Sequence, residues 1–207
     1  IEINRIGFQN VISVNKNFSA NNYKEFLDLL SKSKGKHTYA TPGLGGTHHL
    51  LMENYKSIVK VSVSHIPYRG AGPALKDTSD GKVDIMFDNL PSSLAYIQEG
   101  KLKPIVIASP NRISHLPNVP TFKEIGLDSM NRTVFFGLTA PPETSDEAVN
   151  KISQALKVVL AKPEVKEKLE KIGAFADFKT PEEQKKMIEN DYNAYVNIVK
   201  EKKLSIR

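Results

Sequence analysis

The stretch YATPGLGGTHHL, residues 39–50, combines residue types that suit the binding of an anion. Strand-forming residues lead into a proline and three glycines, and Thr-His-His then opens an apolar segment with helical spacing. Glycine lets a backbone approach a ligand closely, and the first N–H groups of a helix carry partial positive charge. A carboxylate or a phosphate is the ligand that such a turn favours. The same pattern also fits a tight turn without a ligand, so the residues alone leave both interpretations open.

The turn lacks the signatures of nucleotide-binding loops and of hydrolases. It has no Lys-Ser/Thr pair as in a P-loop, and its glycine spacing does not fit G-x-G-x-x-G. The chain contains no G-x-S-x-G, and no Ser/His/Asp set with supporting spacing. Nothing in these patterns demands an enzyme.

Other polar residues follow predicted strands in the same way. Asp88 ends the apolar run VDIMF, where a ligand-facing carboxylate belongs in an open α/β sheet, although it suits a helix cap equally well. Tyr68 and Arg69 also follow a predicted strand. They could donate hydrogen bonds to a ligand, or they could be ordinary surface residues. His49 and Glu53 stand at i and i+4, a metal-binding geometry, but a third ligand is missing. We therefore favour a partly exposed helix histidine at position 49, and predict no metal and no cofactor.

Composition narrows the classes of partner. The 207 residues carry a net charge of +6, but the C-terminal lysines alternate with glutamates, as on a solvated helix face. Basic clusters with interleaved aromatics are absent, so we expect no nucleic-acid partner. The chain has no cysteine, which excludes disulfides and thiolate chemistry. No apolar run reaches the ~20 residues of a membrane span. The chain opens in strand-like sequence without a signal-peptide pattern, which suggests that the natural protein begins further upstream.

Strands and helices alternate through the first two thirds of the chain. Strands are predicted at residues 10–15, 36–41, 59–67, 82–89, 103–109 and 134–140. Helical patterns lie between them, with Asn21 or Asn22 as the first cap. This alternation predicts βαβ units and a mostly parallel sheet covered on both faces. Three amphipathic helices follow Pro142, the last with Thr180 as its cap and Pro181 at its first position.

Several of these segments, in this order, resemble the substrate-binding proteins of tripartite tricarboxylate transporters, the Bug or TctC family. They are YATPGLGGTHHL, HIPYRGAGPAL, GKVDIMFDNLPSSLAYIQEGKLKPIVIAS and LPNVPTFKEIG, followed by FFGLTAPPETS and LAKPEVKEKLEKIGA. The resemblance implies an α/β fold of the type II periplasmic-binding-protein class, with two lobes of mostly parallel sheets around a ligand cleft. It also implies a periplasmic, non-enzymatic protein that delivers small carboxylates to membrane transporter subunits.

The resemblance further implies a division of the chain and a set of ligand-binding residues. Residues 11–132 form the second lobe with half of the cleft, entered through a crossover strand near Val11–Asn15. Residues 1–10 and 133–207 are the remnant of a first lobe that lacks the family's N-terminal third. The implied ligand-binding residues are Thr41, Gly43, Gly45, Gly46, Thr47, His48 and Asp88, the last on the facing wall.

The sequence therefore predicts a solute-binding protein for a small organic carboxylate. Two alternatives remain: a ligand-sensing effector domain of a transcription regulator, and a hydrolase using Asp88 with His65 or His115. An incomplete first lobe would leave apolar helix positions such as Ile152, Leu156, Val159 and Ile188 facing solvent, and we therefore expect self-association.

Overall fold

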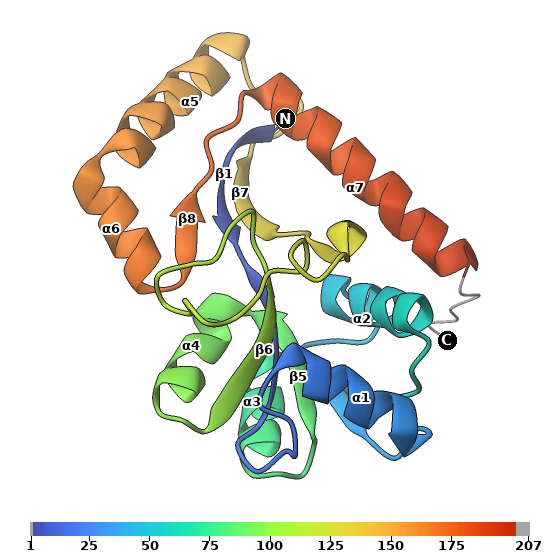
Figure 1. Cartoon of the computed structure of the whole chain (residues 1–207). Helices are drawn as coiled ribbons and strands as arrows, with labels where there is room; N and C mark the ends of the chain where they lie inside the picture. The colour runs from blue at the N-terminus through green and yellow to red at the C-terminus, as the bar shows by residue number, and fades with distance from the viewer. Residues whose placement is uncertain (1, 202–207) are drawn as a thin grey trace. The chain divides into compact units, whose positions relative to one another are not determined.

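The computed structural model describes residues 2–201, which fall into two compact units (Figure 1). The smaller unit contains the chain up to Phe8 together with Val134–Asn197. The larger unit contains Gln9–Thr133 and the described residues from Ile198 to Glu201. Each unit has its own sheet, and each is described by itself.

The larger unit is built on a five-stranded sheet in the order β4-β3-β5-β2-β6. Its strands are β2 (Asn10–Asn15), β3 (Thr38–Thr41), β4 (Ser64–Pro67), β5 (Ile85–Asn89) and β6 (Leu102–Ala108). The expected strands 59–67 and 82–89 are shorter than predicted, because residues 61–63 and 82–84 form a loop and a bend before β4 and β5. The helix before β4 continues to Val59 and ends at Lys60 in a left-handed conformation.

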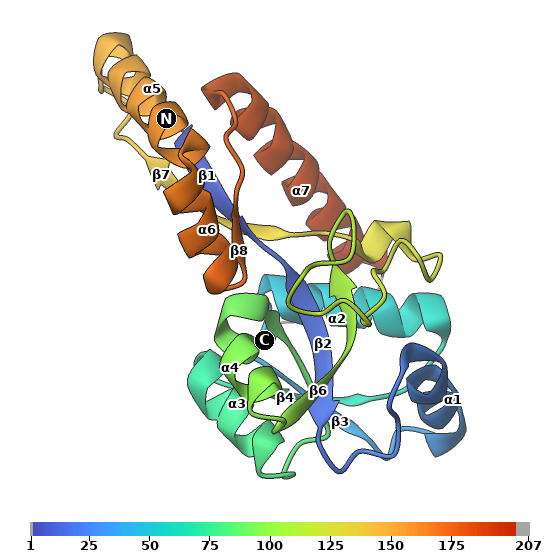
Figure 2. The same cartoon turned by 60° about the vertical axis from the view of Figure 1, so that its left-hand side comes forward.

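Helices cover both faces of this sheet. They are α1 (Tyr23–Ser33), α2 (Thr47–Val59), α3 (Ala71–Ser79) and α4 (Leu90–Gln98). Figure 2 shows α3 and α4 on one face and α1 and α2 on the other. Each helix buries its apolar side: Phe26 and Leu30 of α1 lie in the core, and Leu90 and Leu94 of α4 pack on Val11 of β2. The predicted covered α/β sheet is confirmed for this unit.

The smaller unit contains a three-stranded sheet in the order β7-β1-β8 and the C-terminal helices (Figure 1). The strands are β1 (Glu2–Phe8), β7 (Val134–Thr139) and β8 (Ala174–Ala176), and the helices are α5 (Asp146–Ala161), α6 (Pro163–Lys171) and α7 (Pro181–Glu201). A short 3₁₀ helix, Asp128–Met130, precedes β7 in the chain. Strand β8 was not predicted, because three residues are too short to show an alternating pattern.

Strand direction corrects the expectation of mostly parallel sheets. Strand β3 runs parallel to β4 and β5, but β2 runs antiparallel to β5 and β6. In the smaller sheet, β1 runs antiparallel to both of its neighbours, so this sheet contains no parallel pair. Strands joined by helices therefore share one direction, as βαβ units require. The N-terminal strands β1 and β2 are inserted between them in the opposite direction.

The predicted helix caps are confirmed. The Asn22 side chain accepts a hydrogen bond from the N–H of Glu25 at 3.0 Å, and Glu25 accepts one in return from Asn21. Thr180 and Glu183 form the same reciprocal arrangement at the start of α7, with Pro181 as its first residue. Ser145 caps α5 by accepting from Ala148. These caps satisfy N–H groups that a helix start leaves without intrahelical partners.

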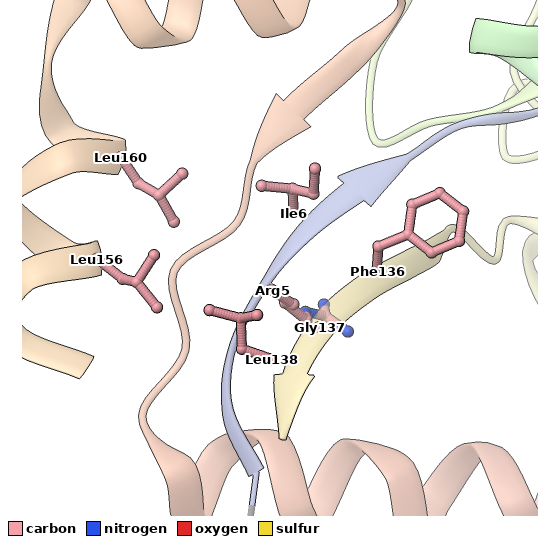
Figure 3. Close-up of a pocket in the computed structure, with 7 residues that line it drawn as sticks. All are labelled: Arg5, Ile6, Phe136, Gly137, Leu138, Leu156 and Leu160. Atoms are coloured by element: carbon pink, nitrogen blue, oxygen red, sulfur yellow. The ribbon is translucent and has the colours of Figure 1, made fainter. Parts of the chain in front are cut away.

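Exposed apolar side chains concentrate in the smaller unit. Of the four helix positions expected to face solvent, Ile152 and Val159 are exposed, whereas Leu156 and Ile188 are only partly so. The side chains of Phe136 and Leu138 on β7 are 66% and 51% exposed. They border an apolar hollow of about 230 Å³ between α5 and the sheet, with Leu156 and Leu160 on the opposite wall (Figure 3). An apolar area of this kind is normally covered in soluble proteins.

We expect the chain to self-associate through this apolar area at micromolar concentration. Phe136→Ser should weaken the association at least about tenfold, because it removes a large exposed ring from the contact. Ile58→Ser is the matched control, since it removes an exposed apolar side chain from the larger unit. Sedimentation equilibrium checks both variants. A parent chain that sediments as a monomer throughout, or equal effects of the two substitutions, would contradict the prediction.

Candidate functional site

The glycine turn connects β3 to α2 at the carboxyl end of β3. Gly45 has a φ of +72°, a left-handed conformation that favours glycine, and Gly46 is the residue that caps α2. Two backbone hydrogen bonds attach the start of the turn to the loop after β4: Tyr68 N–H donates to Thr41 O at 3.1 Å, and Gly70 N–H donates to Pro42 O at 2.8 Å. The turn therefore lies at the edge of the sheet where open α/β proteins bind ligands.

Helix α2 begins without a side-chain cap. Its cap residue, Gly46, has no side chain, so the N–H groups of the first turn have no acceptor of the kind that Asn22, Ser145 and Thr180 supply elsewhere. The helices that follow β4 and β5, α3 and α4, also begin without a side-chain cap. Because parallel strands end at one edge of a sheet, three uncapped helix starts are placed along the carboxyl edge, and each carries partial positive charge.

A partly buried hydrogen-bonded chain holds the first half of the turn. The Thr41 hydroxyl donates to Gly43 O at 3.1 Å, and the Nε2 atom of His65 lies 2.7 Å from the same hydroxyl oxygen. Since the hydroxyl proton points to Gly43, His65 must donate through Nε2–H. Burial, and then the neighbouring His49, lower the pKa of His65 to about 4, so the ring is neutral at pH 7.

His49 holds the second half. Its Nδ1 atom accepts a hydrogen bond from the N–H of Gly45 at 3.1 Å. Its ring stacks on that of His65, with centroids 4.1 Å apart and planes inclined by 11°, and His65 stacks in turn on Tyr39. The expected partly exposed helix histidine is therefore wrong, because the side chain is buried. The structure therefore shows that the His49 side chain contacts the glycine turn, which the sequence did not predict.

The His48 side chain is buried, and its ring is hydrogen-bonded within the larger unit. Its Nε2 atom lies 3.0 Å from Oδ1 of Asn10 and 3.2 Å from Oδ1 of Asn89, which join β2 and β5 to α2. Burial lowers the pKa of His48 to about 4, so a neutral ring donates its single Nε2 proton to these two oxygens. His48 therefore orients the start of α2, and only its backbone N–H remains for a ligand.

Asp88 lies on the other face of the sheet from these histidines. Phe87 contacts His48 on the α2 face, whereas Met86 packs with Leu75 on the α3 face. Side chains alternate along a strand, so Asp88 shares the face of Met86. Its carboxylate is fully buried and neither oxygen has a hydrogen-bond partner. Burial dominates and raises the pKa of Asp88 to about 6, whereas the nearby backbone N–H of Asn89 and the Ser92 hydroxyl act in the opposite direction.

Six of the seven predicted ligand residues divide into two groups, and the seventh, Asp88, lies on the other face of the sheet. Thr41, the N–H of Gly45 and the His48 ring are already hydrogen-bonded and shape the turn. Gly43, Gly46 and Thr47 are partly or fully exposed, and they present their backbone to solvent together with the Thr47 hydroxyl. Sequence reasoning missed the roles of His49 and His65. The i+4 spacing from Gly45 to His49 is a local signal that the pattern contained.

The geometry does not assemble the other chemistry considered from the sequence. His65 is hydrogen-bonded to Thr41, and Asp88 points to the opposite face, so these two groups do not form a catalytic pair. Glu53 accepts from Tyr39 and Lys56, at 2.6 Å each. In residues 2–201, no cluster of three metal-ligating side chains is found. The Tyr68 hydroxyl donates to Asp77, whereas Arg69 is exposed at the same edge as the turn.

Comparison with protein families identifies the class of protein. Residues 1–204 match the family model of the tripartite tricarboxylate transporter family receptor, TctC. The chain belongs to this family. It is 29% identical over 167 residues to the protein BugT of Bordetella pertussis, which covers 81% of this chain and 51% of that protein. The chain spans about half the length of the curated relatives that it matches first.

Solved structures show the same fold. A periplasmic transporter structure matches all of this chain and 69% of its own, with 38% identity and a TM-score of 0.92. MatC of Rhodopseudomonas palustris, solved with bound malate, matches 96% of this chain and 69% of its own, with 25% identity and a TM-score of 0.81. The periplasmic-binding-protein fold expected from the sequence is confirmed, and its relatives are transport receptors rather than enzymes.

None of the helices between residues 2 and 201 is both long and apolar enough to cross a membrane.

The buried Asp88 carboxylate generates a prediction about stability. Its folded pKa of about 6 exceeds the ordinary value of 3.8, so the native state binds more protons than the unfolded chain between these values. The free energy of unfolding should therefore fall as pH rises from about 4 to 6. Asp88→Asn removes this dependence, and at pH 7 it should stabilise the protein by up to about 3 kcal/mol, given ~1.4 kcal/mol per pKa unit.

Denaturant unfolding at pH 4 and pH 7 measures this effect. Parent and variant should agree at pH 4 and differ at pH 7. Asp84→Asn is the control, because this carboxylate is partly exposed and hydrogen-bonded to Thr38. A loss of stability in Asp88→Asn at pH 7 would show that the Asp88 carboxylate is paired, contrary to the structure.

Proposed function

We propose that this chain acts as a periplasmic solute-binding receptor that captures a small organic carboxylate for a tripartite tricarboxylate-type membrane transporter. The observation that carries the proposal is the uncapped start of α2 at Gly46, which lies at the carboxyl edge of the sheet in a hydrogen-bonded turn. The family of the chain and the malate bound to its relative MatC support a carboxylate as the ligand.

Simple electrostatics favours an anion at this place. The N–H groups of Thr47 and His48 point out of the helix start, and the Thr47 hydroxyl adds a third donor. Charge-assisted hydrogen bonds contribute ~1.5–3 kcal/mol each when they are desolvated. The nearby starts of α3 and α4 add favourable potential. The exposed guanidinium of Arg69 lies at the same edge and contributes further positive charge.

The proposal also assigns each of the two units to a lobe of the family fold. We assign the larger unit as the second lobe of the family fold, carrying one half of the ligand cleft, and the smaller unit as the remnant of the first lobe. The ligand then contacts Gly43, Gly46 and Thr47 directly. Thr41, Gly45 and His48 hold the turn in place through their hydrogen bonds and do not contact the ligand through their side chains. Asp88 is left out of the ligand set, because its side chain lies on the other face of the sheet.

Gly46→Val tests the assignment cleanly. Gly46 has a φ of −72°, and a Cβ there would meet only Gly43 O, at 3.6 Å, so the variant should fold normally. Its side chain would stand over the first N–H groups of α2 and exclude a carboxylate. We expect malate affinity, measured by calorimetry, to fall at least about tenfold, while Thr47→Val, which removes one donor, costs less.

Gly72→Ala is the matched control for this series. A Cβ at Gly72, in the first turn of α3, would meet nothing within 4 Å, so the variant should bind as the parent does. A panel of mono-, di- and tricarboxylates extends the titration beyond malate. If Gly46→Val binds the best carboxylate as tightly as the parent, the turn is not the ligand site. If the parent binds no carboxylate, the proposed function is wrong.

A further inference from the structure

Two histidines clamp the glycine turn from opposite ends. His65 reaches Gly43 O through the Thr41 hydroxyl, and His49 accepts the N–H of Gly45 directly. The two rings lie parallel and in contact, 4.1 Å between centroids. They come from different elements, β4 and α2, so the stack links the neighbouring strand to the helix whose start forms the site.

We propose that His49 is a positioning residue for this anion site, and that its protonation makes carboxylate binding weaken as the pH falls. The part of this proposal that concerns carboxylate binding rests on the proposed function. The part that concerns the conformation of the turn does not. The geometry fixes the proton positions. Because Gly45 N–H is a donor, Nδ1 of His49 must be unprotonated, and its ring proton lies on Nε2.

Protonation reverses this contact. A proton on Nδ1 of His49 would face the N–H of Gly45, donor against donor, and the hydrogen bond would break. The charge would also lie against the stacked ring of His65. The remaining groups around the pair are Tyr39 on β3 and Glu53 and Lys56 on α2. The Glu53 carboxylate favours protonation, whereas burial and the Lys56 ammonium oppose it.

The sign of the pH dependence follows from these contacts. Burial lowers the pKa of both histidines below the ordinary 6.5, that of His65 to about 4. The clamped turn is thus fully favoured above about pH 6.5, and it is lost as the pH falls toward the folded pKa of His49. A cationic histidine beside an anion site would ordinarily strengthen binding at low pH. The contact between His49 and Gly45 instead predicts that carboxylate affinity falls at low pH.

The clamp can be measured without any ligand. In ¹⁵N-labelled protein, the ring nitrogens of His49 should report an Nε2–H tautomer with a pKa below 6.5. The Gly45 amide signal should titrate with the same midpoint. An Nδ1–H tautomer, or a Gly45 amide that ignores the titration of His49, would overturn the proposal. This measurement needs no substitution and is independent of carboxylate binding.

Two variants separate the acceptor from the ring. Asn places its amide oxygen near the position of Nδ1, so His49→Asn keeps the acceptor without the titration. Phe keeps the stack but removes the acceptor. At pH 7, malate affinity should stay within about threefold of the parent in His49→Asn, and fall about tenfold or more in His49→Phe. His115→Asn, a substitution of a histidine far along the chain from the turn, should change nothing.

A pH series completes the test. The ratio of parent affinity to His49→Asn affinity cancels the protonation of the carboxylate itself, and it should fall between pH 7 and pH 5. A constant ratio, or a His49→Phe variant that binds as the parent does, would contradict the positioning role. If no carboxylate binds any of these proteins, the proposed function fails, and the tautomer and Gly45 measurements alone decide whether the clamp exists.

Discussion

The start of α2 lacks a side-chain acceptor, and this single constraint explains most of the arrangement around it. Gly46 has no side chain that could accept from the first N–H groups of the helix, in contrast to the reciprocal cap at Thr180. Such a start is useful only if the backbone stays fixed, because a mobile turn would let water satisfy its amides in many ways. Neighbouring elements supply the fixing: His65 through Thr41, His49 through Gly45, and the backbone of Tyr68 and Gly70.

The sheet explains how these supports reach the turn. Strands β3, β4 and β5 run in the same direction, so their carboxyl ends and the following helix starts share one edge. Strand β2 runs against them, and it places Asn10 opposite Asn89, where both side chains meet the His48 ring. The antiparallel strand therefore joins the first residues of the larger unit to the helix whose start forms the candidate site. In the smaller unit β1 is inserted in the same manner, between β7 and β8.

Much of this fold is predictable from local sequence, and the exceptions have physical reasons. Helix boundaries follow from caps and periodicity, as Asn22 and Thr180 show. The direction of β2 is not encoded in its own residues, because an apolar strand buried on both faces reads alike in either orientation. Long-range pairing decides that direction.

The glycine turn was predictable as a feature of the fold, but the contacts of the side chains around it were not. The glycine turn was found because strand, glycine and helix signals coincide there. The sequence also assigned His48 and Asp88 to the ligand, whereas the structure buries the His48 ring against Asn10 and turns Asp88 to the face of α3. The direction of the Asp88 side chain follows from the register of β5, and the position of the His48 ring depends on its contact with Asn89 of the same strand. A single sequence does not reveal this register. The sequence favours a partly exposed helix residue at His49, although the contact of this side chain with Gly45 is local.

The central claim is that backbone amides at the start of α2 hold a carboxylate, and amide chemical shifts test it most directly. In a titration of the ¹⁵N-labelled chain with malate, the signals of Gly46, Thr47 and His48 should shift saturably and together. The Gly45 amide, already bonded to His49, should move less, and chloride at equal ionic strength should not reproduce the pattern. Saturable shifts confined to other residues, or none at these three amides while malate binds, would contradict the account.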